Sequence, residues 1–272
     1  MKIIEINNVS YTVGSHQKRE GLPRLLMLHG FMGDHRAFNH LIDNLGKFCN
    51  PITVDLLGHG RSSKPANPER YYEKQQVDDL ATLIGQLDIS PLFLHGYSMG
   101  GRLALKTALA HPDLFRGLIL ESTNCGITDD QERKHRRQTD CQRANRITDN
   151  FEHFLRHWQR LPLFEPPGPV DLKLGKKYAA IQQSQSPKAI SASLRGFGTG
   201  RMKPCCGELS RLQLPVLLMA GSADEKYQQI NQALVQKLPN AHFSSIRAGH
   251  RAHLDNPPGF IEEIKLFMYG RN

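Results

Sequence analysis

The chain has 272 residues, 39% of them hydrophobic and 22% charged, and it is long enough to bury a core without the help of disulfides or metals. Its longest apolar stretches, such as LPVLLMAG at 214–221, are far shorter than the roughly 20 residues of a membrane span, so we expect no membrane partner. The net charge of +9 lies mostly in residues 129–203, which hold 15 Lys and Arg against 8 Asp and Glu.

That basic segment is open to several interpretations. It can be a solvated helix face, which charge alone favours, a surface for nucleic acid, or a cover that attracts a small anion. Few aromatic residues are interleaved with its basic residues, whereas single-stranded nucleic acid stacks on such aromatics. We therefore expect no nucleic-acid partner.

The N-terminal half alternates short apolar runs with helical patterns. Residues 1–14 contain polar residues where a signal peptide needs a continuous apolar region, which predicts a cytoplasmic protein. Beyond them the patterns predict strands at 24–30, 51–60, 91–98 and 116–123, and helices at 37–48, 77–89 and 99–112. Such alternation is typical of a parallel sheet with helices on both faces.

From residue 122 to residue 211 this rhythm stops. Charged helical patterns at 132–147 and 151–161, a Pro-rich turn at 165–169 and a further pattern at 186–200 contain no convincing buried strand. Strands at 214–221 and 241–249 and helices at 224–238 and 258–268 then resume the alternation. We predict an α/β fold whose core comprises residues 1–121 and 212–272, with a helical cap inserted at 122–211.

The five cysteines, at positions 49, 125, 141, 205 and 206, show neither CxxC spacing nor histidine pairs at zinc-site intervals. We interpret them as free thiols. The alternative, which we favour less, is that the adjacent Cys205 and Cys206 form a redox-active pair. No metal and no cofactor are expected.

A serine between glycines ends the strand at 91–98. The stretch LHGYSMGGR (94–102) runs from a predicted strand directly into a predicted helix, which forces Ser98 into a tight turn that side chains at Gly96 and Gly100 would obstruct. The motif alone is weak, because a glycine-rich turn with a capping serine has the same letters. Its place between strand and helix favours a serine presented as nucleophile or base.

The partners that such a serine needs follow in the expected chain order. Asp224 comes after the strand at 214–221, and His250 follows the strand at 241–249, so both lie at the same sheet edge as Ser98. A hydroxyl needs a histidine base, and the histidine needs an acid that fixes its tautomer. We predict the triad Ser98, Asp224 and His250.

Other residues compete for two of these roles. Asp224 can also be the N-cap of the following helix, and the two roles are compatible. Glu121 and Glu225 are the alternative acids, and His253 is the alternative base. Only His250 directly follows its strand and glycine.

An oxyanion hole is expected beside the serine. The stretch LHGF (28–31) ends a buried strand, so the N–H groups of Phe31 and Met99 can converge on one point. The alternative is a plain turn in which the Phe31 ring fills a gap in the core. The polar loop at 55–65 lies at the same edge and is expected to support the site without reacting.

With these motifs the chain resembles the α/β-hydrolases over nearly its whole length. Within them it resembles the 2-succinyl-6-hydroxy-2,4-cyclohexadiene-1-carboxylate synthases of menaquinone and phylloquinone biosynthesis. The segments that carry this likeness are LHGFMGD, DLLGHGRS, GYSMGGRLAL, ERKHRRQTD, FGTG, GSADEKY and AGHRAHLDNP. The Gly-Gly-Arg continuation and SADEKY are the most telling.

The resemblance implies an elimination in which Ser98 acts as a base and pyruvate leaves a small polycarboxylate substrate. Arginine pairs with carboxylates in a bidentate way, which would give the basic segment a purpose. A serine esterase, a thioesterase or a carbon–carbon bond hydrolase would use the same triad and is the alternative. A ligand receptor on an inactive hydrolase fold is disfavoured by the intact triad.

The resemblance also implies substrate-binding arginines. Arg102 lies one helical turn after Ser98 and matches the family's substrate-binding arginine, although an exposed helix charge would look the same. In ERKHRRQTD the second arginine matches Arg136, less securely Arg133 or Arg137, and a solvated helix face is the alternative for that run.

Aromatic residues complete the implied pocket. Trp158 matches the family's aromatic wall and Tyr97 a pocket tyrosine, and both can equally be core residues. One departure concerns a third family arginine, where this chain has glutamines at 182 and 183, with lysines at 176 and 177 further back. Either a lysine substitutes or substrate recognition differs.

Overall fold

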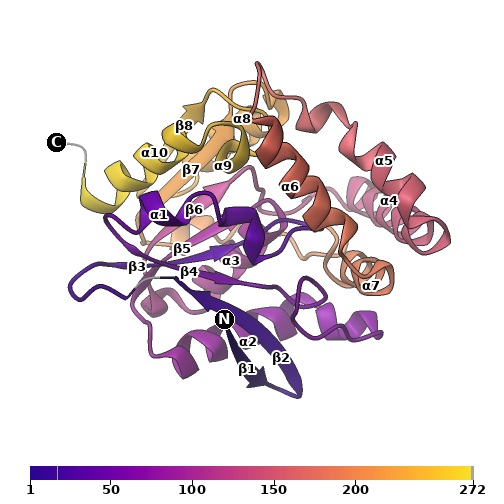
Figure 1. The fold of residues 1–272 in the computed structure, drawn as a ribbon, viewed down its shortest axis with the longest axis horizontal. Helices are drawn as coiled ribbons and strands as arrows, with labels where there is room; N and C mark the ends of the chain where they lie inside the picture. The colour runs from indigo at the N-terminus through magenta and orange to yellow at the C-terminus, as the bar shows by residue number, and fades with distance from the viewer. Residues whose placement is uncertain (17, 271–272) are drawn as a thin grey trace.

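An eight-stranded, mostly parallel sheet runs through the computed structural model, which describes residues 1–16 and 18–270 (Figure 1). The strands lie in the order β1-β2-β4-β3-β5-β6-β7-β8. The six strands β4, β3, β5, β6, β7 and β8 run parallel to one another. The strands are β1 (Lys2–Ile6), β2 (Val9–Ser15), β3 (Arg24–Leu28), β4 (Asn50–Val54), β5 (Leu92–Tyr97), β6 (Phe115–Glu121), β7 (Val216–Gly221) and β8 (Ala241–Ile246).

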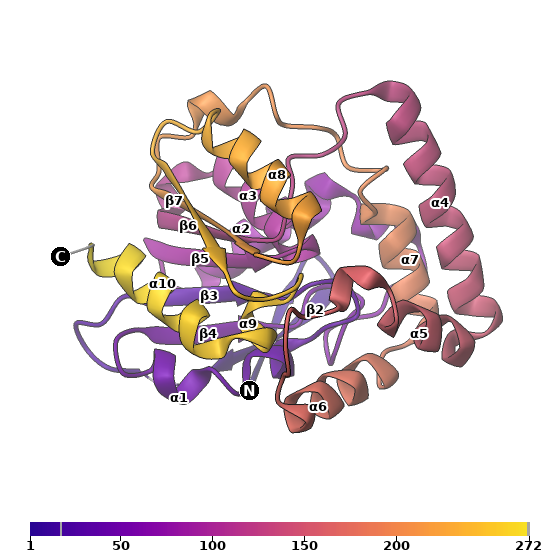
Figure 2. The same ribbon diagram turned by 90° about the horizontal axis from the view of Figure 1, so that it is seen from above.

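Helices cover both faces of the sheet, as Figure 2 shows from above. The α-helices are α1 (Ile42–Leu45), α2 (Glu73–Leu87), α3 (Met99–Ala110), α4 (Asp130–Asp149), α5 (Phe151–Gln159), α6 (Leu172–Gln183), α7 (Pro187–Phe197), α8 (Glu225–Val235), α9 (Ala252–Asp255) and α10 (Pro257–Tyr269). Short 3₁₀ turns are η1 (His35–Phe38), η2 (Pro68–Tyr71), η3 (Pro112–Leu114), η4 (Pro162–Phe164) and η5 (Leu209–Arg211).

Alternate residues of the central strands enter two separate cores. In β3, Leu26 and Leu28 join the core that contains Leu103 of α3, whereas Leu25 and Met27 join the core beneath α1 and α10. A strand buried on both faces produces the continuous apolar runs seen in the sequence, because successive side chains point to opposite sides. The predicted α/β class is confirmed.

The sequence patterns did not predict the N-terminal hairpin at the edge of the sheet. Strands β1 and β2 pair antiparallel, and β2 pairs antiparallel with β4. The two turn residues Asn7 and Asn8 have φ of 48° and 63°, which asparagine tolerates better than most residues. The two asparagines between stretches of alternating apolar residues are the feature of the sequence that could have predicted this hairpin.

Between β6 and β7 the chain forms helices α4 to α7 and no strand. Figure 2 shows these helices grouped together at the right of the view, beyond one end of the strands. They have a small core of their own, formed by Ala144 and Ile147 of α4 with Ile190 and Leu194 of α7, and Met32 of the loop after β3 packs into it. The loop after β3 is therefore one of the places where this segment packs against the rest of the protein.

The prediction of five free thiols is wrong for one pair. Cys125 and Cys206 form a disulfide, while Cys49, Cys141 and Cys205 are free. The partners lie 81 residues apart, in the connections that lead into and out of the helical segment. Spacing could not reveal this pair because only the return of the chain to β7 brings the two connections together.

None of the helices among the described residues combines the length and apolarity that crossing a membrane requires.

Candidate active site

Ser98 lies in a strained turn between β5 and α3. Its φ is 50° and its ψ is −105°, a conformation that L-residues rarely adopt. A Cβ on Gly96 would lie 2.5 Å from the carbonyl oxygen of Gly100, and one on Gly100 would lie 2.5 Å from the carbonyl oxygen of Leu28. Both glycines are thus required by backbone contacts, as the spacing predicts.

Hydrogen bonds from the next strand hold this turn. The N–H of Ser98 donates to the carbonyl oxygen of Glu121 at 2.8 Å, and the Thr123 hydroxyl donates to the carbonyl oxygen of Ser98 at 2.7 Å. The peptide groups before and after the strained serine are therefore both held, one by the last residue of β6 and one by Thr123.

The three predicted triad residues lie together at the carboxyl edge of the sheet. His250 Nε2 is 3.3 Å from Ser98 Oγ, and His250 Nδ1 is 2.6 Å from Asp224 Oδ2. The other oxygen of Asp224 accepts the N–H of Tyr227 at 3.4 Å and caps α8. Asp224 thus has both geometries that the sequence left open.

The alternative acids and base lie elsewhere. Glu121 is fully buried and accepts hydrogen bonds from His95 and His253, so His253 is paired with Glu121 and not with Ser98. Glu225 begins α8 and is exposed. The geometry therefore brings only Asp224 and His250 into line with the serine.

The two residues predicted for an oxyanion hole both line the cavity above Ser98. Met99 is the first residue of α3, and a first-turn N–H has no partner within its own helix. Phe31 follows β3, and its ring meets the Trp158 ring edge to face at 5.6 Å. His29 holds the loop that carries Phe31, because its Nε2 accepts the N–H of Leu56 at 3.0 Å.

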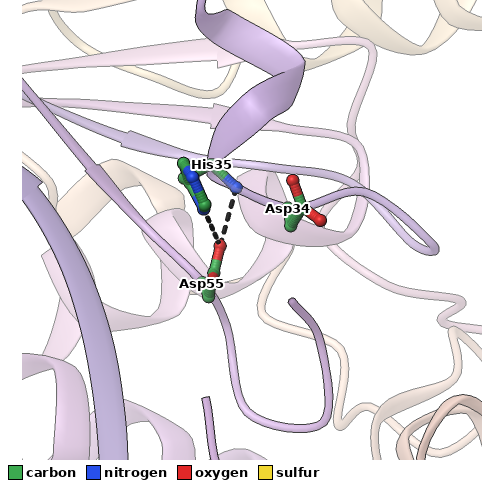
Figure 3. A group of neighbouring side chains, drawn as sticks. All are labelled: Asp34, His35 and Asp55. Atoms are coloured by element: carbon green, nitrogen blue, oxygen red, sulfur yellow. Dashed lines mark hydrogen bonds and ion pairs between the residues drawn. The ribbon is translucent and has the colours of Figure 1, made fainter. Parts of the chain in front are cut away.

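A group of Asp34, His35 and Asp55 supports the same loop and has the composition of a metal site (Figure 3). Its oxygens are already engaged. Asp55 accepts the backbone N–H and Nδ1 of His35 at 2.8 and 2.7 Å and the N–H of Arg61 at 2.8 Å, while Asp34 pairs with Arg36 at 2.6 Å. Figure 3 shows Asp34 beside the bonded His35–Asp55 pair without joining it. The group ties two loops together.

A cavity of about 180 Å³ lies over Ser98 and His250. Its walls come from the loop after β3, from α3 and from the helical segment between β6 and β7. The lining residues are Phe31, Tyr97, Ser98, Met99, Arg102, Asn124, Arg136, Arg143, Trp158, Leu161, Leu163, Phe164, Tyr178, Gln182, Ser193, Leu194, Phe197, Gly198, Thr199, Lys226, Tyr227 and His250. Among these described residues there is no aspartate or glutamate.

The family model of the alpha/beta hydrolase fold matches residues 23–257. The chain belongs to the α/β-hydrolase fold family. Similar proteins share most of its length: a putative 2-succinyl-6-hydroxy-2,4-cyclohexadiene-1-carboxylate synthase of Bacillus subtilis (strain 168) is 33% identical over 246 residues, or 90% of this chain and 89% of that protein.

Two further likenesses agree with this assignment. The 2-succinyl-6-hydroxy-2,4-cyclohexadiene-1-carboxylate synthase of Yersinia enterocolitica is 28% identical over 90% of this chain and 86% of its own. The structure of MenH from S. aureus matches this α/β-hydrolase with a TM-score of 0.89 and 30% identity, over 95% of this chain and 97% of that one.

Arg102 is the cation of this α/β-hydrolase nearest in sequence to the elbow. It is 6% exposed, and its guanidinium donates to Thr199 Oγ1 at 2.8 Å and to the carbonyl oxygen of Phe197 at 3.1 Å, both neutral groups. Burial and the neighbouring charge of Arg136 lower the pKa of Arg102 to about 10, so it is still a cation at neutral pH. A buried cation without a carboxylate partner favours an anionic ligand.

Helix α4 supplies two more cations to the cavity. Arg136 and Arg143 both line it, and Asp140 lies 2.9 Å from Arg136 and 3.6 Å from Arg143. The alternatives to Arg136 lie outside the lining: Arg133 pairs with Asp130, and Arg137 Nε donates to the carbonyl oxygen of Gly200.

Arg143 and Lys226 were missed from the sequence. Arg143 lies two turns after Arg136 and hence on the same face of α4, a spacing that could have identified it. Lys226 follows Asp224 by two residues. At the place of the expected third arginine, Gln182 lines the cavity and accepts a hydrogen bond from Gln159, whereas Lys177 lines a separate groove.

Tyr97 and Trp158 line the cavity and also pack in the protein. Tyr97 is 4% exposed, its ring lies 5.5 Å from that of His250, and burial raises its pKa. Trp158 contacts the rings of Phe31 and Phe164, each at 5.6 Å. Each residue therefore lines the cavity and also packs against neighbouring side chains, so the two roles that the sequence left open are both observed.

Proposed function

We propose that this enzyme is a carbon–oxygen lyase that eliminates pyruvate from 2-succinyl-5-enolpyruvyl-6-hydroxy-3-cyclohexene-1-carboxylate to give 2-succinyl-6-hydroxy-2,4-cyclohexadiene-1-carboxylate. The likeness to synthases of that name supports the reaction. The observation that carries the proposal is the cavity itself, where a Ser98–His250 pair faces Arg102, Arg136, Arg143 and Lys226. The substrate has carboxylates on the ring, the succinyl arm and the enolpyruvyl group, which match this charge.

The names of substrate and product define the bond changes. The ring double bond C3=C4 becomes two double bonds, C2=C3 and C4=C5, so hydrogen leaves C2 and the enolpyruvyl oxygen leaves C5. The electron pair of the C2–H bond forms C2=C3, the former C3=C4 pair moves to C4=C5, and the C5–O pair leaves on oxygen. The leaving enolate takes a proton on carbon and becomes pyruvate.

In this reaction Ser98 is the base. Its hydroxyl proton passes to His250 Nε2, and its oxygen then accepts the proton from C2. Asp224 holds His250 with Nδ1 protonated and stabilises the imidazolium. His250 returns its proton to the leaving enolate, so both residues end the cycle as they began.

The succinyl carbonyl on C2 explains the need for an oxyanion hole. Loss of the C2 proton places negative charge on that carbonyl oxygen, and the N–H groups of Phe31 and Met99 are proposed to receive it. Arg102, Arg136, Arg143 and Lys226 would hold the carboxylates in the cavity. We propose that residues 122–211 act as the cap that closes over them.

Pyruvate release is the test, followed by lactate dehydrogenase and NADH after the substrate has been generated enzymatically. We expect fast release by the wild type and a loss of at least about 10³-fold in Ser98→Ala. The exposed Ser222 provides the matched control, since Ser222→Ala should release pyruvate at the wild-type rate. Absence of release from the wild type would favour an esterase, thioesterase or carbon–carbon hydrolase, which a panel of activated esters and thioesters would identify.

A further inference from the structure

A second buried carboxylate lies on β6, the strand next to the one that leads into Ser98. Glu121 ends β6 and is fully buried, and three nitrogen atoms surround its carboxylate. Oε1 accepts the backbone N–H of His253 at 3.0 Å and contacts its Nδ1 at 2.8 Å, while Oε2 lies 3.1 Å from His95 Nε2. The proposed elimination assigns no role to any of these three residues.

Two contacts connect Glu121 to the triad. Its carbonyl oxygen accepts the N–H of Ser98, and its carboxylate holds His253, three residues after His250. The Tyr97 ring is near both histidines, with ring centroids 4.7 Å from that of His253 and 5.5 Å from that of His250. Glu121 therefore fixes the serine turn and the histidine loop at once.

The hydrogen bonds define the charge of this group. An ionised carboxylate only accepts, so His253 carries its proton on Nδ1 and His95 carries its proton on Nε2. The remaining nitrogens, His253 Nε2 and His95 Nδ1, are buried, and no described residue offers them a hydrogen bond. A second proton on either ring would bury a charged donor without a partner, which disfavours the imidazolium form and leaves the negative charge of Glu121 in place.

The pKa of Glu121 is that of a carboxylate that stays ionised. Burial alone would raise the pKa of Glu121, but the contacts with His253 and His95 outweigh burial and hold the pKa well below its ordinary value. Burial likewise lowers the pKa of His95, which keeps that ring neutral.

Other titratable groups face the same region from every neighbouring element. Arg251 and Asp255, on the segment that carries His253, bear opposite charges. Tyr97 and Tyr178 are neutral because burial raises the pKa of each. Burial also lowers the pKa of His40, whose Nε2 lies 2.7 Å from the carbonyl oxygen of His253. None of these groups cancels the charge on Glu121 by a direct ion pair.

We propose that Glu121 is a positioning residue whose fixed negative charge favours the imidazolium of His250. When Ser98 passes its proton to His250, Asp224 stabilises the new positive charge by direct contact, and Glu121 does so through space from behind the Tyr97 ring. Its hydrogen bonds to His253 meanwhile keep the loop at 249–255 in place. The inference rests on the proposed role of His250 as the acceptor of the Ser98 proton and is independent of the substrate.

Nitrogen NMR of protein labelled with ¹⁵N-histidine tests this without any substrate. The ring signals of His250 would be assigned with His250→Gln and titrated in wild type and in Glu121→Gln. We expect the titration midpoint of His250 to be lower in Glu121→Gln by about 0.5 to 1 pH unit, because the variant keeps the size of the side chain but removes its charge. Equal midpoints would overturn the proposal.

Asp79→Asn is the matched control. Asp79 is also a buried carboxylate with three donors, from Tyr11 at 2.6 Å, Arg70 at 2.6 Å and Asn7 at 2.9 Å, but it lies on α2, away from the triad. Its variant should leave the His250 midpoint unchanged. A shift as large as that of Glu121→Gln would mean that loosening of the fold, and not charge, causes the effect.

The wild-type spectra provide a second test of the proposal, and this test does not depend on any variant being folded. At neutral pH they should show His253 neutral with its proton on Nδ1 and His95 neutral with its proton on Nε2. An imidazolium at His253 would contradict the proposal, because the Glu121 group would then have no net charge. An imidazolium at His253 would not change the outcome of the pyruvate assay. Likewise, a wild type that releases no pyruvate would not change the NMR result.

Discussion

Asp224 accepts a hydrogen bond of 2.6 Å from His250 with one oxygen and caps α8 with the other. One carboxylate thus connects His250 to a helix N-terminus, where a negative charge is favourable. The two functions can be separated, because a neutral oxygen caps a helix as well as a charged one.

Asp224→Asn should reduce kcat by about 10³- to 10⁴-fold with little loss of stability. The amide oxygen still caps α8, but the amide neither stabilises the imidazolium nor holds the correct tautomer. Asp224→Ala should lose a further ~1 kcal/mol of unfolding free energy with the cap. Steady-state kinetics and thermal melts measure both. An Asn variant with wild-type kcat would exclude Asp224 from the mechanism.

Arg143→Gln should weaken the handling of a polycarboxylate substrate. Loss of one charge-assisted hydrogen bond is worth roughly 10- to 100-fold in kcat/KM, and most of the change should appear in KM because the residue binds and does not react. Lys134→Gln, on the exposed side of α4, provides the control and should behave as wild type. Similar kinetics for the two variants would remove Arg143 from the binding site.

The disulfide predicts the number of reactive thiols. Protein unfolded without reductant should show three thiols, from Cys49, Cys141 and Cys205, and all five after reduction. Cys125→Ser should lower the free energy of unfolding by about 2 to 4 kcal/mol, because Cys125 and Cys206 close a long loop, whereas Cys141→Ser should change it little. Five thiols before reduction would show that the bond is absent.

Gly96→Ala should destabilise the protein by about 1 to 3 kcal/mol or prevent folding. The added methyl group would meet backbone atoms of Gly100 and Gly101 at 2.5 and 2.6 Å, which cannot move without distorting the elbow. Gly175→Ala, where nothing lies within 4 Å on α6, should instead stabilise by up to ~1 kcal/mol through helix propensity. Urea denaturation distinguishes them, and a neutral effect at Gly96 would contradict the packing argument.

Asp55 should contribute to acid unfolding. Burial alone would raise the pKa of Asp55, but hydrogen bonds from His35 and Arg61 lower it below the ordinary value of 3.8. A lowered folded-state pKa stabilises the protein fully above pH 3.8, and this contribution disappears as the pH falls through the folded-state value. Asp55→Asn should therefore be less stable at neutral pH and lose less stability on acidification. Parallel stability curves for the two proteins would refute this.

The sequence identified the elbow and its partners because chain order and strand ends contain that information. In a parallel sheet the carboxyl ends of strands meet at one edge, so a serine, an aspartate and a histidine that follow β5, β7 and β8 all come to that edge. This prediction used only the order of the strands and the residues that follow them, and no distance between atoms. It also left the two readings of Asp224 open, and the structure contains both.

What the sequence did not reveal depends on contacts between distant segments. Lys226 lies far from α4 in the chain, and only the folded arrangement, in which α4 packs on α7, brings Lys226 to the same cavity as Arg143. Cys125 and Cys206 meet for a similar reason. Glu121 was considered only as an acid for His250, since nothing in its local sequence indicates that its partner is His253.

The disulfide and its surroundings also bear on how the helical segment is joined to the sheet. The Cα atoms of Cys125 and Cys206 are 5.1 Å apart, and Gly126 has a φ of +97° that places it against Pro204. The helical segment thus leaves and re-enters the sheet at a single seam. A segment of another length and charge in place of residues 127–203 would therefore start and end at the same two points of the sheet. Such an exchange would alter the walls and the charge of the cavity, whereas Ser98, Asp224, His250 and Glu121 all lie outside the exchanged residues.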